Sequence, residues 1–194
     1  MKQIVNNHSF TFKNVLDTPF TLKLLEWRNQ DFVRENMVDD RVISEENHMA
    51  FLEKLKTDDS MKVYLAFYDN KPVAVMTFRY NNNIIESGSY IIDKDDLSKG
   101  FGVVTGYARF EYIFGQFPDS SMQTVILEHN KKNIRLQENF GCILDKTIKI
   151  KKTDGTIENA FVYTMKKTNW EQKKEKVEML VSHIVPIGNI GRIG

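Results

Sequence analysis

Short stretches rich in β-branched and aromatic residues fill the middle of the chain, and polar turns separate them. Residues 62–68 (KVYLAFY), 73–80 (VAVMTFRY) and 84–92 (IIESGSYII) are of this kind. The linkers between them, DNKP and NNN, are typical of tight turns. The pattern therefore predicts a meander of three antiparallel strands.

Apolar residues at helical spacing predict four helices around this meander. These helices cover residues 18–29, 43–57, 101–116 and 130–141. Ser44 is a favourable N-cap for the second helix. Gly141 suits the left-handed position that commonly follows the end of a helix.

Further strands are predicted at residues 10–14 and 122–128, and a hairpin at 142–167 turns at TDGT. A strand–helix–strand step inside an otherwise antiparallel sheet gives an α+β fold. We therefore expect a mixed, mostly antiparallel, seven-stranded sheet flanked by helices, formed by residues 1–168. Residues 169–194 combine a charged helical segment with a glycine-rich end, and we expect them to form an appendage that frays.

Composition narrows the function classes. Lys and Arg number 27 and Asp and Glu 26, so charge gives no reason to expect nucleic acid or an anionic membrane as a partner. The apolar runs are too short to cross a bilayer, and the first residues lack the apolar core of a signal peptide. The single cysteine, Cys142, precludes an internal disulfide, and the four histidines show no metal-ligand spacing. We therefore expect a cytoplasmic protein without a metal.

A Gly-x-Gly pattern, Gly100-Phe101-Gly102, stands directly before the predicted helix 101–116. The first amides of a helix have no partner within the helix and lie at the positive end of its dipole. Glycines let a phosphate approach these amides closely, so the pattern predicts an anion site. The alternative is a tight loop before an ordinary helix.

The order of elements and two motifs resemble the GNAT superfamily of acyl-CoA-dependent N-acetyltransferases. That family has Gln/Arg-x-x-Gly-x-Gly/Ala between its fourth strand and the next helix, where this chain has LSKGFG, departing at Leu97. A second family motif, Asn-x-x-Ala-x-x-Leu-Tyr-x-x-x-Gly-Phe, corresponds to NKKNIRLQENFGC. The match holds at Asn130, Leu136 and Gly141 and fails at Asn133, Gln137 and Cys142.

The GNAT resemblance implies acetyl-CoA as cosubstrate, with its pyrophosphate on the backbone of the glycine loop. The loop residues implied are Leu97, Lys99, Gly100, Phe101, Gly102 and Val103. The fourth and fifth strands splay apart in this family, which assigns the pantetheine arm to the backbone of Ile91 and Ile92. Asn130 would hydrogen-bond the arm, unless it serves only as a helix cap.

A second resemblance, to bacterial acetyltransferases of nucleotide-linked amino sugars in the pseudaminic acid pathway, concerns the acceptor. It is carried by Trp27-Arg28-Asn29, Met37, His48, Phe51 and the Gly88–Tyr90 segment. It implies that Trp27, Arg28, Asn29 and His48 bind the acceptor. The plain alternatives are core packing for Trp27 and Phe51 and a surface position for Arg28 and His48.

The implied chemistry is direct attack of an uncharged amine on the thioester. Glu86 is a candidate base, directly or through water, and Tyr90 a candidate substrate-facing phenol. Gln137 stands where the family commonly has a tyrosine that protonates the leaving thiolate, and an amide cannot do so. Tyr90, favoured over Tyr163, is one substitute; departure of an unprotonated thiolate is another.

Three functions fit these residues. The first is acetylation of the amino group of a UDP-linked 4-amino-4,6-dideoxy sugar. The second is acetylation of a protein N-terminus or a polyamine, although a near-neutral chain does not favour a basic ribosomal target. The third is a non-catalytic acyl-CoA-binding module, suggested by Leu97 and Gln137. The sequence leaves open the sugar, the nucleotide and whether the chain forms a homodimer.

Overall fold

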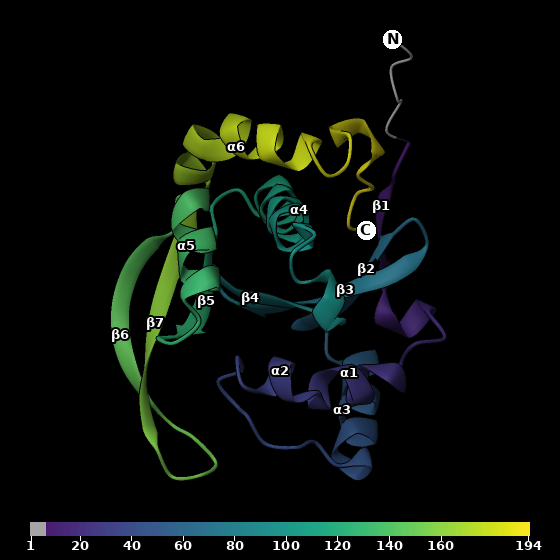
Figure 1. Ribbon diagram of the computed structural model, residues 1–194, viewed down its shortest axis with the longest axis vertical. Helices are drawn as coiled ribbons and strands as arrows, with labels where there is room; N and C mark the ends of the chain where they lie inside the picture. The colour runs from purple at the N-terminus through teal and green to yellow at the C-terminus, as the bar shows by residue number, and fades with distance from the viewer. Residues whose placement is uncertain (1–6) are drawn as a thin grey trace.

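A seven-stranded sheet runs through the computed structural model, which describes residues 7–194 (Figure 1). The strand order is β1-β2-β3-β4-β5-β7-β6, and all neighbours are antiparallel except β4 and β5. The strands are β1 (Phe10–Asn14), β2 (Met61–Tyr68), β3 (Lys71–Asn81), β4 (Ile84–Ile91), β5 (Ser121–Leu127), β6 (Ile143–Lys151) and β7 (Ile157–Lys166). The predicted α+β fold is confirmed.

Helices cover both faces of the sheet (Figure 1). One face carries α1 (Lys23–Asn29), α2 (Asp31–Arg34) and α3 (Glu45–Thr57). The other carries α4 (Phe101–Gln116), α5 (Lys131–Phe140) and α6 (Lys167–Ser182). Short 3-10 turns lie at Val15–Asp17, Lys94–Asp96 and Ile187–Asn189. Each face therefore has its own apolar cluster, with the sheet between them.

Capping residues set the helix ends much as the sequence indicates. The side chain of Ser44 accepts a hydrogen bond from the Asn47 amide at 3.2 Å and begins α3. Gly141 ends α5 with φ of 95°, and the Cys142 amide donates back to the Gln137 carbonyl at 3.0 Å. The first helix differs from the prediction, because residues 18–22 form turns and α1 begins only at Lys23.

The parallel pairing of β4 and β5 is short. Only Ile84–Glu86 of β4 pair with Ser121–Gln123 of β5, although both strands continue beyond these residues. The two strands then diverge, which leaves backbone groups of each without a neighbouring strand. This seam between the two halves of the sheet is the splay that the family resemblance implies.

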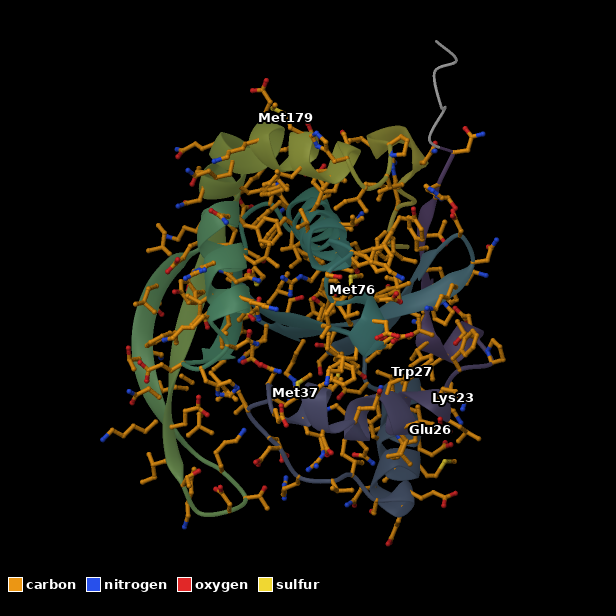
Figure 2. The ribbon with its side chains drawn as sticks, viewed as in Figure 1. Lys23, Glu26, Trp27, Met37, Met76 and Met179 are labelled. Carbon is orange, nitrogen blue, oxygen red and sulfur yellow. The ribbon has the colours of Figure 1, made fainter. Side chains whose placement is uncertain are left out.

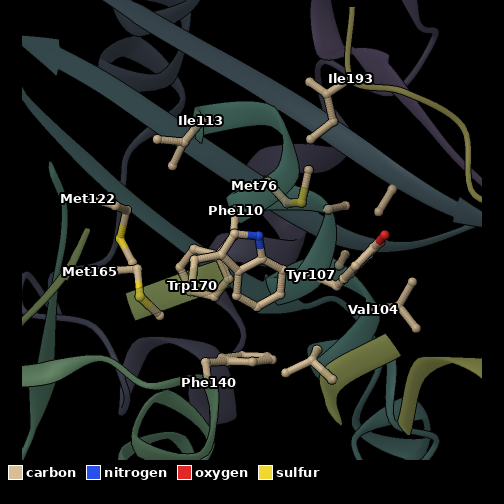
Figure 3. Packing of buried hydrophobic residues seen from close by; sticks show 14 of the residues in the cluster. Met76, Val104, Tyr107, Phe110, Ile113, Met122, Phe140, Met165, Trp170 and Ile193 are labelled. Carbon is tan, nitrogen blue, oxygen red and sulfur yellow. The ribbon is translucent and has the colours of Figure 1, made fainter. Parts of the chain in front are cut away.

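The core above the sheet is built around α4 (Figure 3). The Trp170 ring of α6 lies 4.9 Å from the Phe110 ring of α4, centroid to centroid. Its indole Nε1 donates to Glu111 Oε1 at 2.8 Å, so the buried polar atom is satisfied. α6 is thereby fixed across α4.

The structure places residues 169–194 differently from the expected appendage. Val177 and Val181 of α6 and Ile193 near the end are buried in the same cluster as α4. The Gly191 amide donates to the Phe10 carbonyl at 2.7 Å, which joins the final segment to β1. The charged residues of α6 face solvent, and they outnumber the buried apolar residues, so the composition of this segment does not indicate that it packs on the core. This segment belongs to the single packed domain.

Neither a membrane span nor a metal cluster is found among residues 7–194. None of the described helices is long and apolar enough to cross a membrane. None of the described His, Cys, Asp and Glu residues form a group of three or more that could hold a metal ion.

Candidate active site

A cavity of about 1210 Å³ opens at the seam between β4 and β5. It reaches from the layer of α1–α3, through the gap in the sheet, to α4 and α5. Its lining includes Arg28, Phe32, Asp39, His48, Gly88, Tyr90, Ile91, Leu97, Gly102, Arg109, Thr124, Asn130, Asn133 and Gln137. A ligand can therefore touch both helical layers at once.

Three backbone amides at the start of α4 are available to a ligand. Gly100 adopts φ of 79°, which favours glycine and turns the chain into the helix. The Lys99 amide donates to Asp96 and the Val103 amide to Gly100. Within residues 7–194, the amides of Gly100, Phe101 and Gly102 make no hydrogen bond. Of the predicted loop, Leu97 and Gly102 line the cavity, whereas Gly100, Phe101 and Val103 lie outside its lining.

A buried carboxylate holds the loop before α4. Asp96 is 1% exposed and accepts hydrogen bonds from Lys99 Nζ at 2.6 Å and Lys71 Nζ at 3.1 Å. Burial alone would raise the pKa of Asp96, but the two lysine hydrogen bonds outweigh it and lower that pKa. Lys99 thus neutralises Asp96 and lies outside the cavity lining, which differs from its predicted place among the residues that bind the cofactor.

The backbone of β4 faces the gap at Ile91 rather than at Ile92. The Ile92 amide donates to the Val73 carbonyl at 3.1 Å, and the Ile92 carbonyl accepts from Gln30 Nε2 at 2.9 Å. Successive backbone groups of a strand point to opposite sides, so those of Ile91 point toward the unpaired side of β4. Asn130 caps α5 through a 3.1 Å bond from the Asn133 amide and lines the cavity.

Arg28 forms part of the wall on the α1–α3 side. Its Nη2 donates to the Asp39 carbonyl, while its Nη1 is buried and has no partner. Burial is the main influence on this guanidinium and lowers its pKa, and the nearby Tyr90 acts in the opposite direction. A cation with an unused donor at a cavity wall is suited to an anionic group of a ligand.

His48 is buried beside this wall and lines the cavity. Its Nε2 lies 2.8 Å from the Thr21 carbonyl, so Nε2 carries a hydrogen and Nδ1 is left for another partner. Its ring stacks at 6.3 Å on that of Phe51, which also lines the cavity. The structure therefore brings the predicted Arg28 and His48 to one cavity.

Two predicted acceptor residues lie behind this wall instead. Trp27 packs at 5.8 Å on Phe20 in the lower apolar cluster and is seen with Lys23 on α1 (Figure 2). Asn29 exchanges two 2.9 Å hydrogen bonds with the backbone of Ile43 and closes the loop that carries Asp39. Both lie outside the lining of the cavity.

The loop that carries Met37, Asp39 and Asp40 is also held by the hairpin of β6 and β7. Lys152 Nζ donates to the Met37 carbonyl at 2.9 Å, and the Thr153 amide donates to Asp40 at 3.1 Å. The loop is therefore fixed at both ends, and the wall that it forms with Arg28 is preformed.

The predicted catalytic residues are separated. Tyr90 lines the cavity, and its burial raises the pKa of the phenol, which stays protonated at neutral pH. Glu86 is exposed on β4 and lies outside the lining. Tyr163, the second phenol considered, donates to Glu138 at 2.9 Å and also lies outside the lining. The roles of Glu86 and Tyr90 stay predictions.

Gln137 lines the cavity in the position that the resemblance assigns to a tyrosine. Its Nε2 donates to Asn133 at 3.0 Å, and its Oε1 accepts from the Cys142 thiol at 3.5 Å. The amide is 3% exposed and fully engaged within the protein. Nothing in this arrangement supplies a proton to a ligand.

Sequence reasoning did not identify Arg109, a 2% exposed cavity residue. Its Nε is buried without a hydrogen-bond partner. The signal was present, because Arg109 is the first charged residue in the otherwise apolar run FGVVTGYARF of α4. A lone charge on a buried helix face indicates a ligand or a buried partner.

Comparison with known proteins decides the class. No protein-family model matches the chain. The acetyltransferase PseH of Campylobacter jejuni is 29% identical over 125 residues, which cover 63% of this chain and 77% of that protein. The chain is an N-acetyltransferase that is similar in sequence to PseH and has the fold of GNAT acetyltransferases.

Solved structures show the same fold. The N-acetyltransferase PseH of Campylobacter jejuni matches with a TM-score of 0.61 and 19% identity over 81% of this chain and 97% of that one. The spermidine N-acetyltransferase of Vibrio cholerae, solved with CoA and spermine, matches with a TM-score of 0.75 and 12% identity, covering 84% and 98%.

Proposed function

We propose that this acetyltransferase transfers the acetyl group of acetyl-CoA to the amino group of a nucleotide-linked amino sugar. The observation that carries the proposal is the unpaired Nη1 of Arg28 in the cavity wall. A nucleotide-linked sugar presents phosphate oxygens to such a donor and an amine to the thioester. The likeness to the acetyltransferase PseH supports acetyl transfer, and the resemblance of Arg28, His48 and the Gly88–Tyr90 segment to amino-sugar acetyltransferases supports this acceptor.

In this proposal the cofactor enters from the α4 side. Its pyrophosphate binds the amides of Gly100, Phe101 and Gly102 at the positive end of the helix dipole. Its pantetheine arm lies along the gap and replaces the missing strand neighbour of Ile91. The side-chain amide of Asn130, at the cavity edge, donates to the arm.

The acceptor occupies the α1–α3 side. On this side Arg28 and Arg41 line the cavity together with Glu35 and Asp39. Asp39 is paired with Arg41 at 2.6 Å, so the guanidinium of Arg28 keeps its unpaired Nη1 for a ligand. A polyamine or a basic protein N-terminus would bring more positive charge to this surface. A phosphate-bearing acceptor would be attracted to it.

The reaction needs an uncharged amine and close alignment. The amine attacks the thioester carbonyl, and a carbon–nitrogen bond replaces the carbon–sulfur bond. Both reactants are held in one cavity, so positioning supplies a large part of the acceleration. Tyr90 hydrogen-bonds the acceptor beside Arg28, and Glu86 takes the amine proton through water, because its carboxylate is exposed and lies outside the cavity lining.

A panel of amines tests the proposal through acetyl-CoA-dependent thiol release. UDP-linked 4-amino-4,6-dideoxy sugars should be acetylated with a far higher kcat/KM than spermidine or a peptide N-terminus. Arg28→Met should raise the KM of the sugar nucleotide at least tenfold and leave CoA affinity unchanged, whereas the matched surface change Arg192→Met should alter neither. A higher kcat/KM for spermidine, or loss of CoA affinity in Arg28→Met, would refute the assignment.

A further inference from the structure

Arg109 is a buried guanidinium without a partner. It is 2% exposed, and within residues 7–194 it makes no hydrogen bond or ion pair. Its nearest compensation is the face of the Phe110 ring, 5.7 Å from Cζ to the ring centroid. An isolated buried cation is costly, so its presence in a cavity wall points to an anion supplied by the ligand.

The groups packed around Arg109 do not supply that anion. Among the described residues, the one titratable group whose charge acts on Arg109 is the Cys142 thiol. Burial raises the pKa of this thiol to about 12, which keeps it neutral. Glu111 of α4 is bound by Trp170 and Lys174, and Glu138 of α5 by Tyr163. β5 contains no titratable residue.

The position of Arg109 along α4 narrows the choice of anion. It lies seven residues after Gly102, or about 10 Å along the helix axis from the free amides. α4 runs back alongside the gap from those amides, and Gln137, whose Oε1 accepts from the Cys142 thiol near Arg109, lines the same cavity. If the pyrophosphate binds at the amides, as the proposed function requires, the reactive end of the pantetheine arm lies near Arg109.

We propose that the guanidinium of Arg109 stabilises the sulfur of coenzyme A as a thiolate when it leaves the acetyl group. The amine nitrogen forms a bond to the carbonyl carbon, and the carbon–sulfur bond breaks with its electron pair passing to sulfur. The amine proton goes to water or to a base on the acceptor side. The thiolate gains its proton from solvent after release, so no acid is needed at the sulfur.

This proposal accounts for the absence of a proton donor on the α4–α5 side. Gln137 has no titratable proton, and Tyr163 is turned to Glu138. Tyr90 lies opposite Val75 of β3, which packs in the lower apolar cluster, so its ring is on the α1–α3 face. Arg109 belongs to α4, on the other face.

Titration of the bound thiol tests the proposal directly. Coenzyme A is mixed with excess protein, and thiolate formation is followed by its ultraviolet absorbance, with desulfo-CoA complexes as the baseline. A free thiol titrates near pKa ~8.5. Bound to the wild-type protein it should titrate at least one unit lower, and Arg109→Gln and Arg109→Met should remove the shift. Cys142 is the protein's single cysteine and stays protonated throughout this range.

Affinity gives an independent readout. A thiol whose pKa falls on binding makes the affinity for CoA depend on pH. For each unit of that fall, CoA should bind about tenfold more tightly at a pH above the pKa of the free thiol than at a pH well below the pKa of the bound thiol. Wild type should show this rise with CoA and not with desulfo-CoA, and Arg109→Gln should show it with neither. Acetyl transfer should fall by ~10²-fold or more in Arg109→Gln, and Arg109→Lys should recover part of the loss.

The outcomes separate this inference from the proposed function. Binding of both CoA and desulfo-CoA, with the same thiol pKa in wild type and Arg109→Gln, would overturn the role of Arg109 alone. Failure of both to bind wild type would overturn the cofactor site and this inference with it. Tyr90→Phe should leave the bound thiol pKa unchanged, and a shift in that variant would assign the sulfur to the phenol instead.

Discussion

Replacing Arg109 by methionine should make the protein more stable. Burial lowers the pKa of Arg109 to about 10. Each unit of pKa difference corresponds to about 1.4 kcal/mol, so the drop from the ordinary arginine value costs the charged folded protein about 3 kcal/mol. Methionine keeps most of the apolar stem and removes the charge. Allowing for lost contacts of the guanidinium, we expect a gain of about 2 kcal/mol in the free energy of unfolding.

Urea unfolding of wild type and Arg109→Met, without ligand, measures this difference. The gain should raise Tm by about 4–8 °C for a domain of this size. Because the folded-state pKa is lowered, the penalty is fully present below pH ~10 and is relieved as pH rises through that value. The gap between the two proteins should therefore be constant from about pH 6 to 9. A less stable Arg109→Met protein would show that the guanidinium is satisfied within the protein, and the reasoning would fail.

Four other substitutions probe separate parts of the molecule. Gly102→Val should weaken CoA binding at least tenfold in calorimetry by covering the free amides, whereas Gly115→Ala, where an added Cβ meets nothing within 4 Å, should not. Tyr90→Phe should raise the acceptor KM in steady-state assays with little change in kcat. A large loss of kcat at unchanged KM would show instead that Tyr90 is the general acid that protonates the leaving thiolate. The lowered pKa of Asp96 stabilises the folded protein, and this contribution is lost as the pH falls through that pKa. In Asp96→Asn, the free energy of unfolding measured with urea should therefore decrease less between about pH 5 and pH 2 than it does in wild type. Trp170→Ala should cost ~3–5 kcal/mol of unfolding free energy, and a near-neutral result would mean that α6 is dispensable.

The order of elements could be predicted because local signals mark most of them. Alternating β-rich runs, the Ser44 cap and the Gly141 end are local properties of the chain, and each reappears in the structure. The tail could not be placed by such signals. Trp170 and Val177 of α6 are separated by charged residues, and only the surface offered by α4 shows that they are core positions.

The site was predictable only where function depends on backbone shape. Gly100 and Gly102 mark the free amides because glycine is required there by conformation and access. Lys99 was predicted as one of the loop residues, yet its charge is used by Asp96 three residues earlier, whose burial the sequence does not show. Arg109 was missed although its lone charge in the apolar run of α4 marks it, and the sequence does not show that its Nε is buried without a partner.

The short seam between β4 and β5 has a consequence for the motions of the protein. A sheet normally opens as one cooperative unit, but here three pairs of residues join β1–β4 to β5–β7. Strand ends beside such a seam open at low free energy, and their amides exchange with solvent sooner than those of the sheet centre. An extended pantetheine arm in the gap would add the missing hydrogen bonds to both halves. The ligand would then act as an eighth strand, and the two halves of the sheet would become one mechanical unit only while the cofactor is bound.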